Sequence, residues 1–174
     1  MSLKKVEFNR YLKDAVEQLP KGAFLCTRDG DKENVMAVGW GAFGSMWGRP
    51  MAIVTVRPSR YSFEMIEKTG EFTLSIPFNQ SQKDNINFCG SYSGREKNKF
   101  EEKSIIKGQG QTLDIPIIEN CQLFYECRVI TKQALSEEML NQNIREMYYP
   151  HGNYHMVYYA EIIDSYVLED DYLK

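Results

Sequence analysis

The stretch that decides the fold runs from Asn34 to Ser62 and reads NVMAVGWGAFGSMWGRPMAIVTVRPSRYS. It contains the spacing G-x-G-x-x-G at Gly39, Gly41 and Gly44. In a dinucleotide-binding domain, this spacing opens a helix whose N-terminus holds a pyrophosphate. Here Gly48 and Pro50 follow and disfavour a helix, because glycine is a poor helix former and proline lacks the backbone donor. The β-branched run Met51–Val56 then predicts a strand, so the stretch argues against a Rossmann domain.

The rest of the chain supplies further short strands with helices between them. Strands are expected over 23–27, 34–39, 51–56, 71–76, 122–131 and 154–167, and helices over 9–19, 62–69, 83–88 and, on a weaker pattern, 136–147. Asp29-Gly30 predicts a hairpin turn, Gly70 a left-handed helix cap, and Ser81 the N-cap of the helix at 83–88. Alternation over 71–76 predicts one face in the core and one facing solvent or ligand. This pattern indicates a mainly-β fold, a β-barrel with inserted helices.

Bulk properties exclude several classes of protein. The 174 residues, 1–174, are best interpreted as a single domain. The net charge of −3 and pI near 5.5 do not indicate binding to nucleic acid or an anionic membrane. No apolar run reaches the roughly 18 residues of a membrane helix, and the polar N-terminus lacks the apolar core of a signal peptide.

The cysteines and histidines give no metal spacing. Cys26, Cys89, Cys121 and Cys127 form no C-x-x-C pair, which predicts reduced thiols in a cytoplasmic protein. His151 and His155 are four residues apart, but Gly152-Asn153 between them disfavours the helix that would bring them together. No metal site is expected.

Several segments, taken in order, carry a resemblance to a known family. They are Asn34-Val35-Met36 leading into Gly39-Trp40, Trp47-x-x-Pro50, Val56 to Ser62, Ile66 to Pro77, Asn87-Phe88-Cys89-Gly90, Ser93-Gly94-Arg95-x-x-x-Lys99-Phe100, Tyr154-His155 and Tyr159-Ala160-Glu161-Ile162. Over roughly residues 15 to 168, this set resembles the flavin reductase-like family, especially its flavoredoxin-type branch, although glycine is more usual where Ala160 stands. The resemblance implies a split β-barrel that binds FMN and usually dimerises.

Two segments could bind a phosphate. The first is Arg57 to Ser62, where two guanidiniums flank two hydroxyls ahead of a helix N-terminus. Alternatively, Ser59 or Ser62 is only a helix cap and the arginines are solvated. The second is Cys89 to Lys99, whose glycines allow close backbone approach and whose Ser93, Arg95 and Lys99 supply donors. Without the resemblance, this segment is more simply a surface loop.

The sequence leaves open which segment takes the phosphate and which the flavin ring, although Arg57, Ser59 and Lys99 are favoured for the phosphate. Gly39, Trp40 and Gly41 would lie beside the ring, but Trp40 is equally suited to the core or a dimer interface. The expected cofactor-binding set is Gly39, Trp40, Gly41, Arg57, Ser59, Arg60, Tyr61, Cys89, Gly90, Ser93, Gly94 and Lys99.

On the resemblance, His155 is the candidate catalytic residue on the substrate side of the flavin; otherwise it is a histidine at a strand end. Cys89 could be a reactive thiol or a small packing residue. No hydrolytic arrangement of residues stands out.

The resulting expectation is an FMN-binding flavoprotein, an NAD(P)H-dependent flavin reductase in which NADH or NADPH binds transiently and transfers hydride to the flavin. The alternatives are a flavoredoxin-like electron carrier, with tightly bound FMN reduced by a redox partner protein, and an FMN-binding module without turnover. A homodimer is expected from the resemblance and from three aromatic residues close together, Trp40, Phe43 and Trp47.

Overall fold

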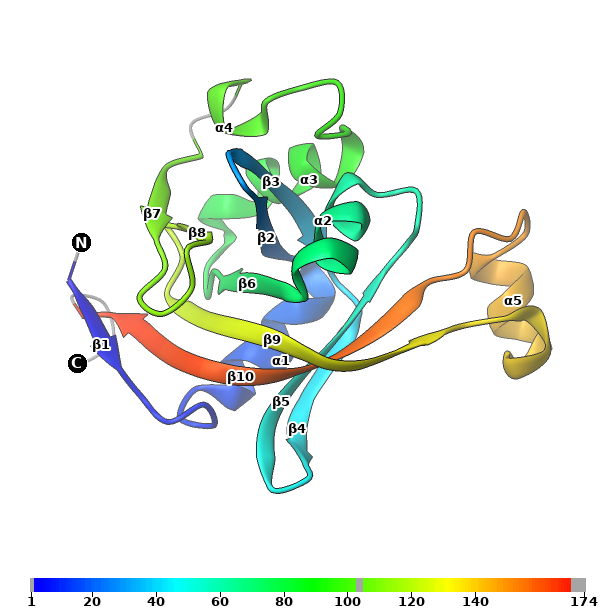
Figure 1. The fold of residues 1–174 in the computed structure, drawn as a ribbon, viewed down its shortest axis with the longest axis horizontal. Coiled ribbons are helices and arrows are strands. Elements are labelled where there is room, and N and C mark those ends of the chain that lie inside the picture. The colour runs from blue at the N-terminus through cyan, green and yellow to red at the C-terminus, as the bar shows by residue number, and fades with distance from the viewer. Residues whose placement is uncertain (1, 103–104, 170–174) are drawn as a thin grey trace.

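The computed structural model describes residues 2–102 and 105–169 (Figure 1). Within these residues, eight strands form one antiparallel sheet, which confirms the mainly-β prediction. In sheet order the strands are β3 (Lys32–Val38), β2 (Ala23–Asp29), β6 (Glu71–Ile76), β9 (Leu123–Ala134), β10 (Met156–Leu168), β5 (Arg49–Val56) and β4 (Gly41–Met46), with β1 (Leu3–Lys5) also on β10. A separate hairpin pairs β7 (Lys107–Gln109) with β8 (Pro116–Ile118).

Helices connect the strands and cover the sheet. They are α1 (Leu12–Gln18), α2 (Tyr61–Thr69), α3 (Lys83–Ser91), α4 (Lys99–Glu102) and α5 (Gln142–Tyr148), with single 3₁₀ turns at Leu19–Lys21, Gln80–Gln82 and Glu137–Met139. None of the helices in the described ranges has the length and apolar composition needed to cross a membrane. Those ranges also contain no group of three or more His, Cys, Asp or Glu side chains able to hold a metal ion.

The glycine-rich stretch was expected to connect the strands at 34–39 and 51–56 without a strand of its own, but it forms a further strand, β4, in a hairpin with β5. Its strands β4 and β5 are joined by Trp47 and Gly48, whose φ angles are 53° and 70°. Two successive left-handed residues make the kind of tight turn whose twist suits a β-hairpin. The hairpin projects from the body of the molecule (Figure 1). No helix follows Gly44, so the sequence argument against a Rossmann domain is confirmed.

One face of β6 is buried where solvent or ligand was expected. Thr73 and Ser75 are fully buried, because β6 lies between β2 and β9 in the sheet and β8 covers this face. The Thr73 hydroxyl donates to the Pro116 carbonyl at 2.6 Å, and the Ile118 N–H donates to the Ser75 hydroxyl at 3.0 Å. The period-two pattern therefore predicted the strand correctly. The expectation that its polar face meets solvent or ligand was wrong, because Thr73 and Ser75 form hydrogen bonds to β8.

Helix ends also differ from the sequence expectations. The first helix starts at Leu12, and the chain continues past Pro20 as a 3₁₀ turn, where proline needs no intrahelical donor. The prediction that Ser81 caps α3 was wrong: Asn79 caps the preceding 3₁₀ turn by accepting from the Ser81 N–H at 3.0 Å. The left-handed cap at Gly70 is confirmed, with φ at 68° and its N–H donating to Ile66 at 2.8 Å.

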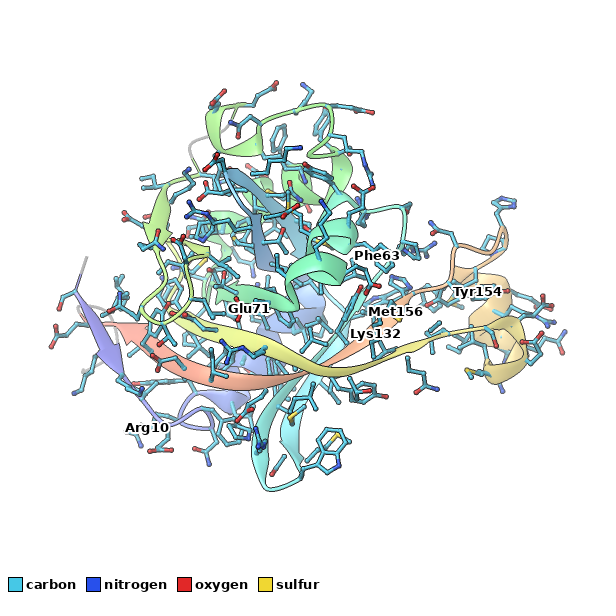
Figure 2. The ribbon with its side chains drawn as sticks, viewed as in Figure 1. Arg10, Phe63, Glu71, Lys132, Tyr154 and Met156 are labelled. Carbon is cyan, nitrogen blue, oxygen red and sulfur yellow. The ribbon has the colours of Figure 1, made fainter. Side chains whose placement is uncertain are left out.

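The far ends of β9 and β10 form an arm that carries α5 away from the sheet's core (Figure 1). β9 is buried up to Cys127 and mostly exposed from Arg128 onward, so the strand leaves the core at that point. Figure 2 shows Tyr154 on this arm beside α5. The weak helical pattern over 136–147 divides into a 3₁₀ turn and α5. The chain then returns through residues 148–155, which reach the segment ahead of α2.

Candidate functional site

Two adjoining cavities occupy the region between β3, the start of α2 and the arm. The larger has a volume of about 550 Å³ and the smaller about 240 Å³. Met36, Arg57 and Arg60 line both, so the two form one elongated site. These volumes lie in or near the range of small-molecule sites, roughly 300–1,000 Å³.

Arg57 stands at the junction of the cavities and is held there by the arm. Its Nη2 donates to the Tyr148 carbonyl at 2.8 Å and its Nη1 to the Asn153 carbonyl at 3.4 Å. The guanidinium carbon lies 5.1 Å from the ring centroid of Tyr149. Arg57 directly follows β5, and Pro58 fixes the turn toward α2. The positive charge is thus already in place at the junction.

Ser59 borders the larger cavity and is positioned from two sides. Asn153 has a φ of 57°, a left-handed conformation that asparagine tolerates better than most residues, and its Nδ2 donates to the Ser59 hydroxyl at 3.0 Å. Arg95 donates from Nη1 to the Ser59 carbonyl at 2.9 Å and also pairs with Glu64. Because the Ser59 oxygen accepts from Asn153, its own hydrogen remains available to a ligand.

Lys99 and Arg60 add two more positive charges to the larger cavity. Lys99 is only 4% exposed, and its Nζ donates to the carbonyls of Val35 at 2.7 Å and Cys89 at 3.1 Å. Burial lowers the pKa of Lys99 from its ordinary value; Cys89 opposes this shift, and the nearby charge of Arg60 adds to the lowering. Arg60 donates from Nη1 to the Gly90 carbonyl at 2.7 Å.

Cations outnumber anions around the larger cavity. Among the described residues that line it, three are positively charged (Arg57, Arg60 and Lys99) and one is negatively charged (Glu96). Backbone and hydroxyl donors of Ser59, Ser93 and Gly94 border the same space. A phosphate suits such a site, because arginine forks, hydroxyls and free amides are its usual ligands.

The smaller cavity lies between β3 and β5, which are close in space but do not pair as strands. Its lining residues include Met36 to Gly39, together with Trp40 and Thr55. Trp40 is 42% exposed and makes an edge contact with Tyr148, at 4.9 Å between ring centroids. The cavity therefore joins the end of β3 to a partly exposed aromatic ring.

His155 closes the smaller cavity. Its ring centroid lies 5.0 Å from that of Trp40, and its Nδ1 lies 2.7 Å from the Tyr149 hydroxyl. Burial lowers the pKa of His155 to about 4, and the positive charges of Arg57 and Arg60 act in the same direction. The imidazole is therefore neutral at physiological pH, so it can form hydrogen bonds but adds no charge.

Most of the site residues expected from sequence come together around these cavities. Arg57, Ser59, Arg60, Tyr61, Ser93, Gly94 and Lys99 line the larger, and Gly39, Trp40, Arg57, Arg60 and His155 line the smaller. Gly94 also packs directly on β3: a Cβ there would lie 2.0 Å from the Asn34 Oδ1 atom.

Three of the expected residues line neither cavity. Gly41 allows β4 to approach β5, since a Cβ there would lie 2.3 Å from the Ile53 carbonyl oxygen. Gly90 supplies the carbonyl that binds Arg60. Cys89 is fully buried in a hydrophobic cluster, and burial raises the pKa of its thiol to about 11. A buried protonated thiol fits the packing role rather than the reactive one.

Sequence reasoning missed Asn34, Met36, Thr55, Asn153 and Tyr149. Asn34 and Met36 lie within the decisive stretch, where their alternation on one strand could have marked a shared face. Asn153 follows Gly152, and both adopt positive φ. That Gly-Asn pair was a readable turn signal but gave no sign of which distant segment it would meet.

The arrangement suits an elongated ligand with an anionic end and a planar end. No nucleophile with an adjacent base was found among the described lining residues, and they contain no carboxylate pair. The site can bind, orient and shield a redox-active group.

The protein-family model described as the flavin reductase like domain matches residues 16–173, nearly the whole chain.

The chain belongs to the flavin reductase-like family.

Solved structures of similar fold agree with this assignment. An FMN-binding domain of a flavin reductase-like enzyme from Shewanella baltica has a TM-score of 0.69 at 21% identity, covering 95% of this chain and 77% of that one. Flavoredoxin from Methanosarcina acetivorans has a TM-score of 0.65 at 26% identity, covering 85% of this chain and 68% of that one. The fold is thus the flavin reductase-like FMN-binding split barrel, as the sequence resemblance implied.

Two curated relatives are also similar in sequence. An uncharacterized protein of Archaeoglobus fulgidus is 28% identical over 121 residues, 70% of this chain and 67% of the relative. Protein YddH of Escherichia coli is 29% identical over 109 residues, 62% of this chain and 56% of YddH. The match to YddH thus spans little more than half of that protein's length.

Proposed function

We propose that the protein binds FMN along the two joined cavities and acts as an NAD(P)H-dependent flavin oxidoreductase. One observation carries the proposal: Arg57 and Arg60 line both a cation-rich cavity and a neighbouring cavity lined by the end of β3, Trp40 and His155. A phosphate fits the first and a planar ring system fits the second. The donor set matches FMN, because the donors gather at one end, where a single terminal phosphate would lie.

Bound FMN would supply the capacity to accept hydride and to pass electrons on. The residues of the chain bind and orient it. Arg57, Ser59 and Lys99 would hold the phosphate, and the backbone from Met36 to Gly39 would face the ring edge. Trp40, which lines the smaller cavity and contacts Tyr148, would cover part of the ring. Hydride transfer needs close alignment and a shielded site more than an acid–base pair, which agrees with the lining residues.

The first experiment is an absorption spectrum of the purified protein, followed by calorimetric titration with FMN and FAD. We expect FMN to bind more tightly, because Lys99 and Ser59 enclose the end where FAD would continue into a second phosphate. Tighter binding of FAD would count against the proposed phosphate position.

The second experiment tests the nicotinamide. Anaerobic mixing of the FMN-loaded protein with NADH or NADPH should bleach the flavin band rapidly with at least one of them. Absence of bleaching with both would rule out the proposed NAD(P)H-dependent activity, but it would not contradict the proposal that the protein binds FMN.

An electron carrier reduced by a partner protein is the second candidate, and one surface favours it. The arm exposes Ile144, Met147 and Tyr148 on one face of α5, at 43%, 68% and 40%, and Tyr148 contacts Trp40 beside the smaller cavity. An apolar patch of this kind commonly marks a contact with another molecule. Full reduction by a ferredoxin-type donor, with no reaction with either nicotinamide, would favour this candidate.

We also propose a homodimer with two flavin sites near its interface. Trp47 is 61% exposed and Trp40 42%, whereas Phe43 packs on Tyr125 and fills the sheet's own core. Two of the three aromatic residues therefore remain for a partner copy to cover. Light scattering at low micromolar concentration should give twice the 20.3 kDa chain mass. A flavin-loaded species at the chain mass would refute the dimer.

The cysteines support a cytoplasmic protein. Cys26, Cys89, Cys121 and Cys127 are all buried free thiols, a condition that a reducing compartment maintains. Cell fractionation would check this location.

A further inference from the structure

Tyr149 lines neither cavity but contacts two residues that do, His155 and Arg57, although its side chain was assigned no role from the sequence. It is 5% exposed, and its hydroxyl lies 2.7 Å from the Nδ1 atom of His155. The face of its ring supports the guanidinium of Arg57, and Tyr154 stacks on it at 5.0 Å between centroids. Its backbone N–H donates to the Arg145 carbonyl at 2.8 Å and closes α5. One side chain thus contacts a group from each cavity.

The direction of the bond between Tyr149 and His155 follows from what each group can pair with. Among the described residues, His155 is the hydrogen-bond partner of the Tyr149 hydroxyl. If Nδ1 were the donor, the phenolic hydrogen would be left without an acceptor in a buried position, at a cost of about 1–3 kcal/mol. The hydroxyl therefore donates, and Nδ1 accepts. Burial also raises the pKa of Tyr149, which keeps the phenol protonated.

The other ring nitrogen of His155 then carries the hydrogen. Nε2 bonds to none of the described residues. Among the described residues, Ser165 Oγ is the one fully buried side-chain polar atom that lacks a hydrogen-bond partner. Because Nε2 also lacks a partner but is not fully buried, it is accessible. The smaller cavity is the space that His155 lines. Nε2–H is therefore a donor offered to whatever occupies that cavity.

We propose that Tyr149 is a positioning residue: it fixes His155 in the Nε2–H tautomer, with that hydrogen available to the ring edge of the flavin in the smaller cavity, while its ring supports Arg57. The inference rests on the proposed function, because it takes the flavin ring to lie in the smaller cavity. The tautomer itself is a property of the protein without ligand, so it can be tested separately.

The test is nitrogen-15 NMR of the histidine rings at pH 7, first without FMN. The chain has two histidines, and His151→Gln leaves His155 as the single signal. We expect Nδ1 to resonate as an unprotonated acceptor and Nε2 as protonated. A protonated Nδ1, or averaged shifts from a mixture of tautomers, would overturn the proposal in the unmodified protein, before any substitution at Tyr149.

Tyr149→Phe then removes only the hydroxyl and retains the ring. The matched control is Tyr154→Phe, because Tyr154 belongs to the same stacked pair and its hydroxyl makes no hydrogen bond recorded among the described residues. We expect averaged tautomers in Tyr149→Phe and a single tautomer in the control. Retention of the single Nε2–H tautomer in Tyr149→Phe would overturn the proposal.

Flavin binding separates this inference from the proposed function. The FMN dissociation constant of Tyr149→Phe should stay within about threefold of the unmodified protein, while its rate of reduction by nicotinamide falls about tenfold, the equivalent of one net hydrogen bond. An unchanged rate would overturn the positioning role. If the unmodified protein binds no FMN, the proposed function fails, and the tautomer result still decides what Tyr149 does.

Discussion

The two cavities are built from different kinds of structure. Loops and helix ends form much of the larger one: the turn ahead of α2, the end of α3 and the start of α4. Strands and the residues next to them form the smaller one, from β3, β5 and the residue before β10. Arg57 and Arg60 line both.

This difference separates affinity from reactivity. The larger cavity has hydrogen-bond donors and several cations, so its residues should determine how tightly the ligand is bound. The smaller cavity has fixed backbone and one neutral imidazole, so its residues should set how the ring is oriented and how fast it reacts. Substitutions confined to one cavity should change one property and leave the other largely intact.

The largest expected effect concerns His155, which belongs to the smaller cavity. Its pKa in the folded protein is about 4, below the ordinary 6.5, so the unfolded chain binds the proton first as the pH falls. The stabilisation is complete above about pH 7 and is lost between about pH 6.5 and 4, amounting to at most about 3 kcal/mol. Urea unfolding should show this loss in the unmodified protein and a smaller one in His155→Gln.

The control for that measurement is His151→Gln, because His151 is exposed. It should follow the unmodified protein across the whole pH range. If His155→Gln and His151→Gln gave the same pH dependence, His155 would not be the buried neutral group that the structure indicates.

The next effect concerns Arg57, which lines both cavities, so its substitution should change both the affinity for the ligand and the properties of the smaller cavity. Arg57→Ala should weaken FMN binding roughly 10- to 100-fold, since a charge-assisted hydrogen bond contributes about 1.5–3 kcal/mol. It should also raise the pKa of His155, because the Arg57 charge is one cause of its depression. Calorimetry and histidine NMR measure the two changes on the same sample.

Arg49→Ala is the matched control, because Arg49 is exposed and pairs with Glu161 on β10, outside both cavities. It should leave FMN affinity unchanged. If Arg57→Ala bound FMN with normal affinity, Arg57 would not be a residue that binds FMN.

The strand-built part of the molecule was the more predictable from sequence. Met51–Val56 could be assigned because β-branched residues and the preceding Pro50 leave few alternatives. The environment of Thr73 could not, because period-two alternation fixes a face but not what covers it. Local patterns specify the strand, whereas the neighbouring hairpin is brought there by the whole fold.

The loop-built cavity was predicted only in part. Ser59 and Lys99 were singled out as donors, and both line the larger cavity. Sequence could not reveal that Lys99 is also bound to the Val35 and Cys89 carbonyls, because those contacts join segments far apart in the chain. Tyr149 was missed for the same reason, since nothing near it in sequence marks its approach to Arg57.

The smallest expected effect concerns Ser59, which belongs to the larger cavity alone. Ser59→Ala should weaken FMN binding about threefold to tenfold, the equivalent of roughly 0.5–1.5 kcal/mol for one neutral hydrogen bond. The rate of reduction at saturating FMN should stay unchanged, because Ser59 does not border the smaller cavity. Calorimetry and anaerobic stopped-flow measurements separate the two quantities.

Two comparison variants decide what the Ser59 result means. Ser45→Ala, on an exposed position of β4, should change neither quantity. Asn153→Gly removes the side chain that donates to Ser59 while tolerating the left-handed backbone, so it isolates the loss of positioning from the loss of the hydroxyl. We expect it to weaken binding less than Ser59→Ala, because the hydroxyl remains able to donate. A change in the reduction rate of Ser59→Ala, with affinity unaffected, would mean that the two cavities do not divide binding from reactivity.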